Sequence, residues 1–360
     1  MRFLTDARAL ADMTARAARV TDRDRPGVLL SAMDGRVRAQ AGGGAFVRAQ
    51  ADATVVEAGD VVANGAWLAA LAAAMPAGEV DVRAADANLS LSGGGMRLRM
   101  RLSDDMTAPP EPRLPDLVMV DGAAFARLCR AVCHATEQPK RNSGFSAFEF
   151  VHLHARDGVL HATATNRTVC ARASMGAPGL PDGEWLTSPT WLQGLRDVDR
   201  LGFTDRLAVA GDASGAVDAF PLADLEYPSR VSRLWWDRAQ AAASARASRP
   251  ELLEAVRALR SVCFDREAHL VPLVFDEADG RLRVSYAGVG ADSDSAGSRL
   301  LDAPASPGLR VCLSASSVSS VLQAMDCDVV ELLALSDPRR PVLFAPEGGE
   351  PEQLEAPMAF

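Results

Sequence analysis

Histidine and cysteine are the residues of this chain best suited to hold a metal ion or act as nucleophiles. His152 and His154 alternate along one predicted strand and His161 follows on the next, while Cys129 and Cys133 stand four residues apart on a predicted helix. A zinc site needs converging nitrogen, sulfur or carboxylate ligands, and no acidic or cysteine residue continues the histidine series. We therefore expect no metal site, and we interpret the two thiols as core residues. A metal-dependent hydrolase built on His152 and His154 is the least favoured function.

Motifs of the common catalytic sites are also missing from the sequence. It contains no GxSxG elbow, no phosphate-binding P-loop and no GxGxxG stretch after a predicted strand. The glycine runs AGGGAF and SGGGMR lie between alternating segments, which is typical of hairpin tips. Because nothing assembles a nucleophile, a base and an orienting group, we predict a protein without catalytic activity or cofactor.

Arginines on predicted helices are the remaining chemical signal. Arg127 with Arg130, and Arg257 with Arg260, lie three residues apart, so each pair shares a helix face. Such a face could hold a phosphate backbone by charge alone, although the whole protein has a net charge of −9. Solvated helix faces in an arginine-rich chain would show the same spacing, so both interpretations remain open. The complete set is Arg8, Arg16, Arg19, Arg127, Arg130, Arg196, Arg257 and Arg260.

Three similar phrases set the order of the elements that carry these residues. They are MDGRVRAQA at 33–41, RDGVLHATA at 156–164 and ADGRLRVSYA at 278–287, about 120 residues apart. An Asp-Gly pair between alternating residues predicts a β-hairpin. Each hairpin follows a helix with an apolar face, such as Leu10, Met13 and Ala17, and precedes a second helix. The pattern predicts an α+β chain of three similar domains, at 1–116, 117–240 and 241–360.

Bulk composition agrees with a folded protein of two or three domains. The chain has 360 residues, of which 48% are hydrophobic and 24% charged. No apolar run reaches the length of a membrane span, and MRFLTDARAL lacks the layout of a signal peptide. Six scattered cysteines without a CxxC pair fit reduced thiols. We expect a cytoplasmic protein. Segments 107–116 and 229–250 are interpreted as linkers.

The ordered motifs resemble the bacterial DNA polymerase III β subunit, the sliding clamp, and suggest a divergent member or paralogue. The pieces that carry the resemblance are MRFLTDARAL, PAGEVDV, ATNRTVCARASM at 164–175, LADLEYPSRV at 222–231, SASSVSSVLQAM and the terminal PMAF. The family implies three clamp domains, each with two helices packed on antiparallel sheets, arranged as half of a ring. Two chains would close head to tail around duplex DNA, without sequence preference, with the helix arginines facing the DNA. The ring would act as a processivity factor in DNA replication, a non-catalytic accessory subunit of the polymerase.

The resemblance also implies a pocket for short peptides of DNA polymerase, the clamp loader and other replication or repair proteins. The matching positions are Phe148, Thr165, Arg167, Thr168, Val169, Cys170, Pro228, Ser232, Arg233, Ser314, Ser317, Val342, Leu354, Pro357 and Met358. Thr168-Val169-Cys170 replaces the usual aromatic residue or histidine followed by Arg-Leu. Ser317 stands where tyrosine is common, and Arg233 where an aliphatic residue is common. We therefore expect a more polar and more open pocket.

A dimer seam is expected between the last strand of the first domain and an edge of the third. MRLRMRL at 96–102 alternates charge with apolar residues, and GADSDSAGSRLL at 290–301 is acidic. Opposite charges on the two edges would set the head-to-tail polarity, although a charged edge strand can also merely resist aggregation. The expected interface residues are Arg97, Leu98, Arg99, Met100, Arg101, Ser261, Val262, Asp292 and Asp294.

The altered pocket keeps a second function open. A clamp-fold paralogue could act as a protein-interaction, regulatory or resistance factor without being loaded on DNA. This alternative predicts weak dimers and no retention on closed circular DNA.

Overall fold

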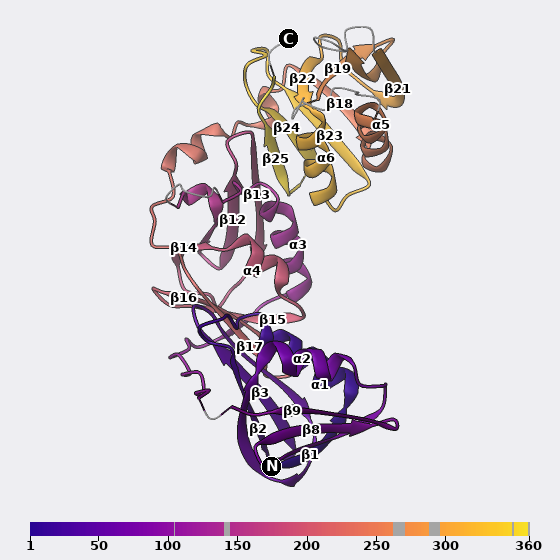
Figure 1. Cartoon of the computed structure of the whole chain (residues 1–360). Coiled ribbons are helices and arrows are strands. Elements are labelled where there is room, and N and C mark those ends of the chain that lie inside the picture. Colours follow the sequence, from indigo (N-terminus) through magenta and orange to yellow (C-terminus); the bar gives the residue numbers. More distant parts are fainter. Residues whose placement is uncertain (104, 140–144, 262–270, 288–295, 348, 359–360) are drawn as a thin grey trace. The chain divides into compact units, whose positions relative to one another are not determined.

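A computed structural model describes residues 1–103, 105–139, 145–261, 271–287, 296–347 and 349–358. The chain divides into two compact units. Unit 1 comprises Met1–Gly122 and Leu195–Leu222, and unit 2 comprises Ala123–Gly194 and Ala223–Phe360. Figure 1 labels many of the helices and strands of both units. No helix in these described ranges is long and apolar enough to cross a membrane.

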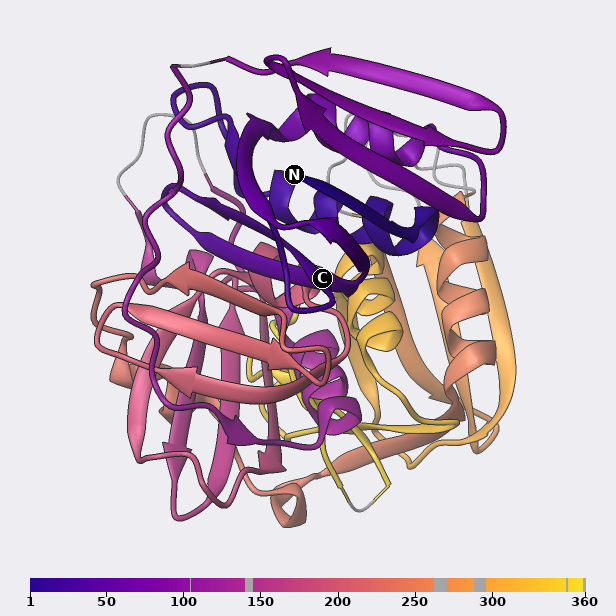
Figure 2. The same ribbon diagram turned by 90° about the horizontal axis from the view of Figure 1, so that it is seen from below.

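Unit 1 contains two antiparallel sheets and two helices, α1 (Ala7–Ala18) and α2 (Gly65–Ala73). The five-stranded sheet has the order β5 (Thr54–Glu57), β1 (Arg2–Asp6), β7 (Glu79–Ala85), β8 (Asn88–Gly93), β9 (Met96–Arg101). The eight-stranded sheet has the order β10 (Val118–Met119), β15 (Val198–Phe203), β16 (Leu207–Asp212), β17 (Val217–Pro221), β4 (Phe46–Asp52), β3 (Arg36–Gly42), β2 (Gly27–Met33), β6 (Gly59–Asn64). Helix α1 packs against α2, β3 and β4, and Figure 2 shows it in indigo beside these strands.

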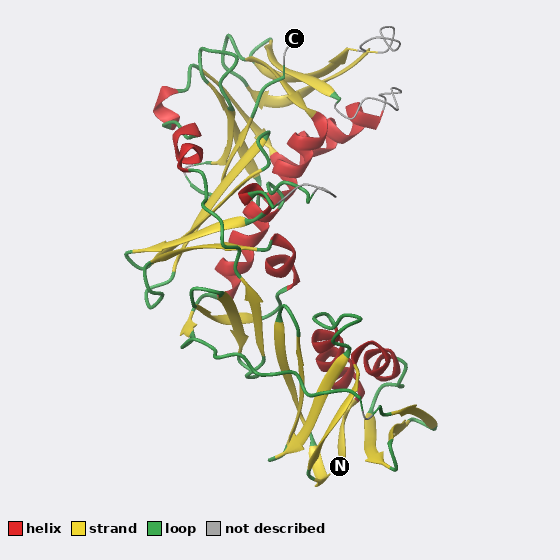
Figure 3. Cartoon of the chain, turned by 60° about the vertical axis from the view of Figure 1, so that its left-hand side comes forward, coloured by secondary structure: helices red, strands yellow, loops and turns green. Residues whose placement is uncertain are grey.

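Unit 2, like unit 1, contains an eight-stranded antiparallel sheet, a smaller antiparallel sheet and α-helices. Its eight-stranded sheet has the order β14 (Gly183–Thr187), β11 (Val151–Arg156), β12 (Val159–Thr165), β13 (Val169–Gly176), β25 (Glu352–Glu355), β24 (Val342–Pro346), β23 (Val329–Ala334), β18 (Ala243–Ser248). The four-stranded sheet has the order β21 (Ala296–Pro304), β20 (Arg281–Ala287), β19 (Pro272–Ala278), β22 (Arg310–Ser314). The α-helices are α3 (Gly122–Cys133), α4 (Pro189–Gly194), α5 (Arg249–Ser261) and α6 (Ala315–Ala324), drawn in red in Figure 3. The mixed helix and antiparallel-sheet architecture confirms the predicted α+β class.

The three Asp-Gly phrases form the same turn. Asp34, Asp157 and Asp279 have φ angles of 51°, 51° and 54°, and the glycine that follows each also has positive φ. Two successive residues with positive φ are the mark of a type I′ turn, whose twist matches that of the strands it joins. The hairpins β2–β3, β11–β12 and β19–β20 confirm the prediction.

The apolar helix faces are buried as the spacing predicts. Leu10 and Ala17 of α1 are fully buried, as are Val132 of α3 and Val256 of α5. The Asp6 carboxylate accepts hydrogen bonds from the backbone N–H groups of Arg8 and Ala9, so Asp6 is the N-cap of α1.

Each eight-stranded sheet joins strands from two different sequence repeats. Strand β17 pairs with β4 in unit 1, and β13 pairs with β25 in unit 2. Continuous backbone hydrogen bonding at these two joints makes the compact units differ from the repeats. The interpretation of 229–250 as a linker is wrong in part, because it contains η2 (Ser229–Leu234), η3 (Arg238–Gln240) and β18.

Candidate functional sites

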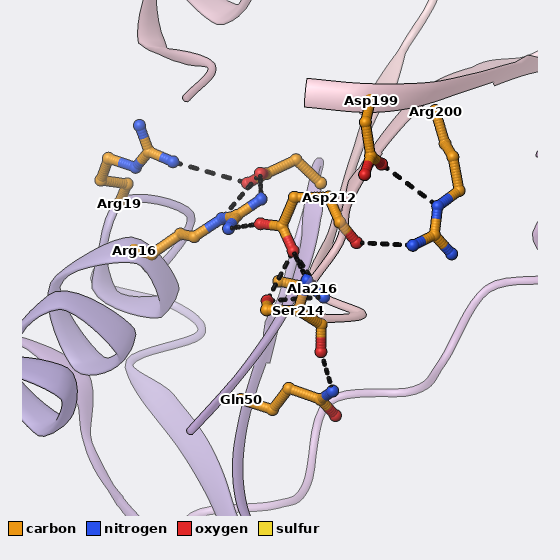
Figure 4. Close-up of polar contacts among 9 residues, drawn as sticks. Arg16, Arg19, Gln50, Asp199, Arg200, Asp212, Ser214 and Ala216 are labelled. Atoms are coloured by element: carbon orange, nitrogen blue, oxygen red, sulfur yellow. Dashed lines mark hydrogen bonds and ion pairs between the residues drawn. The ribbon is translucent and has the colours of Figure 1, made fainter. Parts of the chain in front are cut away.

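Arg16 lies in a buried cluster of opposite charges in unit 1 (Figure 4). Its Nε donates to Asp218 Oδ2 at 2.8 Å, and its Nη1 donates to Asp212 Oδ2 at 2.6 Å. The side chain of Arg16 is 18% exposed, and those of Asp212 and Asp218 are 9% and 4% exposed. Helix α1 is thereby fixed to strands β16 and β17, which come from the next sequence repeat.

Neighbouring donors complete the coordination of Asp212. Its Oδ1 accepts hydrogen bonds from Ser214 Oγ at 2.5 Å and from the backbone N–H of Ala216 at 3.2 Å. Burial alone would raise the pKa of Asp212, but the hydrogen bonds from Arg16 and Ser214 outweigh it and lower the pKa. The cluster therefore holds an ionised carboxylate at neutral pH.

The other predicted DNA-binding arginines occupy different environments. Arg8 on α1, Arg127 on α3, and Arg257 and Arg260 on α5 are exposed, and none forms an ion pair with a described residue. Arg130 lies 3.6 Å from Asp326, and more than half of each side chain is exposed. Arg19, half-exposed at the end of α1, lies 3.5 Å from Asp218.

Arg196 does not lie on a helix. The sequence predicted that it belongs to the second helix of its repeat, but α4 ends at Gly194. Arg196 is exposed in the connection that follows, and its guanidinium donates to the carbonyl of Leu195.

The predicted pocket residues at 165–170 form a tight turn in unit 2. Thr165 Oγ1 donates to the carbonyl of Val169 at 2.8 Å, and Asn166 Oδ1 accepts from the backbone N–H groups of Thr168 and Val169. Arg167 has a φ of 76°, in the left-handed region. Its guanidinium lies 5.2 Å from the ring centre of Phe148, a cation–π arrangement.

Aromatic residues pack around this turn. Phe148, Cys170 and Leu354 belong to one buried hydrophobic cluster that also contains Trp236, with Tyr227 and Trp235 against it. Sequence reasoning did not assign a role to these last three residues. The signal was available, because EYPSRVSRLWW at 226–236 gathers three aromatic side chains in a chain that is only 5% aromatic.

The remaining pocket positions surround the C-terminal strand. The backbone N–H of Ala356 donates to the carbonyl of Thr168, and that of Met358 donates to the carbonyl of Cys312. Ser314 is buried, whereas Ser317, Pro357 and Met358 are half-buried. Val342, on β24, is buried and pairs with Glu355. On η2, Ser232 and Arg233 are exposed next to the half-buried Pro228.

Glu355 is a buried carboxyl at the centre of this region. It is fully buried, and its Oε1 accepts a hydrogen bond from the backbone N–H of Ser314 at 3.1 Å. Its Oε2 has no hydrogen-bond partner among the described residues. Burial, only partly offset by the Ser314 hydrogen bond, raises the pKa of Glu355 well above its usual range.

Five of the expected interface residues lie on one sheet edge, in unit 1. Strand β9 is the edge of its sheet and presents Arg97, Arg99 and Arg101 to solvent, with Leu98 half-buried and Met100 buried. Strand β21 is the edge of the four-stranded sheet and carries Arg299 and Asp302. Ser261 ends α5. Val262, Asp292 and Asp294 lie outside the described residues.

The architecture matches the fold of solved DNA polymerase sliding clamps. Solved structures that it matches include the β subunit of the DNA polymerase of Streptococcus pyogenes, with a TM-score of 0.85, 12% sequence identity and full coverage of both chains. A DNA polymerase III β-subunit sliding clamp of Pseudomonas aeruginosa, solved with griselimycin bound, matches with a TM-score of 0.85 and 15% sequence identity. The match covers both chains in full. The DNA polymerase III β subunit of Thermotoga maritima matches with a TM-score of 0.84 and 13% sequence identity. The match covers 100% of this chain and 99% of the Thermotoga chain.

The chain shares its fold with these sliding clamps, although its sequence identity to them is low. No protein-family model and no curated protein matches the sequence. The chain is therefore a divergent example of the clamp fold.

Removal of the Arg16 side chain should destabilise unit 1. Arg16→Ala leaves Asp212 without its cation and Asp218 with only the more exposed Arg19 at 3.5 Å. We expect the free energy of unfolding to fall by about 2–4 kcal/mol. Arg8→Ala removes an exposed arginine from the same helix and should change stability by less than about 0.5 kcal/mol. Urea unfolding monitored by circular dichroism measures both. Equal stability of the two variants would contradict a structural role for Arg16.

The stability of unit 2 should decrease with rising pH because of Glu355. The unfolded carboxyl ionises near its usual pKa of 4.5, whereas the folded carboxyl retains its proton to higher pH. Glu355→Gln should match the parent at pH 4 and exceed its unfolding free energy at pH 8 by at least about 1.4 kcal/mol, the equivalent of one pKa unit. The exposed Glu347 provides the control Glu347→Gln. Parallel pH profiles for the parent and Glu355→Gln would show that Glu355 is ionised in the folded protein.

Proposed function

We propose that this chain is the subunit of a DNA sliding clamp, a processivity factor that encircles duplex DNA as a head-to-tail homodimer. The observation that carries the proposal is the full-length match to sliding clamps at TM-scores of 0.84–0.85. On this proposal the chain has three clamp domains, at 1–116, 117–240 and 241–360, which form half of a ring. It acts in the cytoplasm as a non-catalytic partner of DNA polymerase.

The strand edges support closure of the ring. In both eight-stranded sheets, four strands from one repeat meet four strands from another. Among the described strands, β9 pairs only with β8, and β21 pairs only with β20. These two edge strands belong to the sheets β5-β1-β7-β8-β9 and β21-β20-β19-β22. Antiparallel pairing of β9 with β21 of a second copy would build a third joint, with five strands of one copy beside four strands of the other.

The exposed helix arginines support contact with the phosphate backbone. Arg127 on α3 and Arg257 and Arg260 on α5 project charge that no described acidic residue neutralises. Contacts of this kind bind DNA without reading its sequence and weaken steeply as salt displaces them. Arg16 contributes less on this proposal, because Asp212 and Asp218 already hold its guanidinium.

Partner peptides would bind in unit 2, around the turn at 165–170 and the C-terminal strand. The contact between Arg167 and Phe148 also favours the second candidate function. Arg167 covers the Phe148 ring and lies 3.5 Å from Glu137 Oε2, so an apolar peptide anchor would have to displace it. A clamp-fold protein whose pocket selects unusual partners could serve in protein interaction, regulation or resistance rather than as a loaded replicative clamp.

Salt-dependent DNA binding tests the proposal. Arg257→Ala/Arg260→Ala should weaken retention on closed circular duplex DNA and reduce the slope of log affinity against log salt by about 1 for each phosphate that the variant no longer neutralises. Arg339→Ala/Arg340→Ala removes the same charge from an exposed turn between β23 and β24 and should leave retention unchanged. Equal behaviour of the two double variants would reject contact between α5 and DNA. Absence of retention by the parent protein would favour the second candidate function.

A further inference from the structure

Three histidines and one glutamate form a row on one face of the unit 2 sheet. His154 of β11 lies directly opposite His161 of β12 on one side and Glu184 of β14 on the other. Directly opposite residues in an antiparallel sheet point to the same face, with Cβ atoms about 5 Å apart. His152 precedes His154 by two residues and therefore shares that face.

These four side chains line a single cavity of about 490 Å³, together with Tyr227 and Trp235. The His154 ring centre lies 6.3 Å from that of His152 and 6.1 Å from that of His161. His152 also stacks on Tyr227 at 4.5 Å, which fixes the orientation of its ring. The three imidazoles are therefore gathered in one concave place.

His152 and Glu184 already have the spacing of two ligands on one ion. His152 Nε2 lies 3.4 Å from Glu184 Oε2. Two ligand atoms at tetrahedral angles, each about 2.1 Å from zinc, are separated by about 3.4 Å.

We propose that His152, His154, His161 and Glu184 bind a divalent transition metal ion, with zinc as the expected occupant. Imidazole nitrogen with one carboxylate is a donor set that suits zinc better than magnesium or calcium, which prefer oxygen ligands. No group of three such side chains in the described residues is already arranged around a metal position. His154 and His161 must therefore turn toward the His152–Glu184 pair. His161 is exposed and His154 half-buried, so they can turn without disturbing the core.

The bound ion would tie three strands together. Strand β14 is the edge of the eight-stranded sheet, and Glu184 is the ligand that it supplies. Because binding to the folded state alone stabilises it, zinc should raise the unfolding temperature of the protein. This inference does not depend on the proposed clamp function, since every ligand lies in one sheet of one chain.

The test is titration of the full chain, stripped of metal with a chelator, with zinc chloride alone. We expect one zinc ion per chain with a Kd below about 10 µM. His154→Gln/His161→Gln and Glu184→Gln should each weaken binding by about tenfold or more. Cobalt(II) should give the intense visible absorption of a four-coordinate site, and magnesium should not compete.

Glu350→Gln provides the matched control. Glu350 also lines the cavity, but its carboxylate accepts a hydrogen bond from Ser174 Oγ at 2.6 Å. This variant should bind zinc as the parent does, and all variants should match the parent in unfolding temperature without metal. A Kd above about 10 µM in the parent would overturn the proposal. Equal affinity of the parent and His154→Gln/His161→Gln, or loss of binding in Glu350→Gln alone, would also overturn it.

Discussion

Backbone pairing between strands of different repeats is the constraint on which the rest of this structure depends. At the joint of β17 with β4, and again at that of β13 with β25, antiparallel hydrogen bonds continue a sheet across a repeat boundary. No repeat completes its own eight-stranded sheet, so each must share strands with a neighbour. The same requirement leaves β9 and β21 as edges in one chain. The proposed ring closure would repeat, between two chains, a contact that the chain already makes twice.

Each joint also contains buried polar contacts. These contacts engage some polar groups of the helices in the fold and leave others exposed. In unit 1, Arg16 forms buried ion pairs with Asp212 and Asp218, so this helix residue stabilises the fold. In unit 2, Gln353 of β25 is fully buried, and its Nε2 donates to the carbonyl of Ala131 on α3. These contacts have directional partners, so they fix register more strictly than apolar packing alone. The arginines that remain exposed are those available for a ligand.

Local features of the fold could be predicted from the sequence, because each depends on neighbours along the chain. The Asp-Gly turns at Asp34, Asp157 and Asp279 and the buried face of α1 follow from residue type and spacing. Partners far apart in the sequence could not be predicted in this way. The ion pairs of Arg16 join residues about two hundred positions apart, and Glu184 reaches His152 only because β14 folds beside β11. The three aromatic residues in 226–236 could be noticed in the sequence. Their packing against the cluster of Phe148 depends on the tertiary structure and could not be predicted.

Mass in solution, measured by light scattering across dilution, tests most directly the claim that two copies close a ring. The account predicts a stable species near twice the 38.0 kDa of one chain, persisting at low micromolar concentration. An Arg99→Glu change on β9 should shift that mass toward one chain, because it alters an exposed residue of the proposed seam. A parent protein that is monomeric at micromolar concentration would contradict closure through β9 and β21, and would leave the clamp fold without a ring.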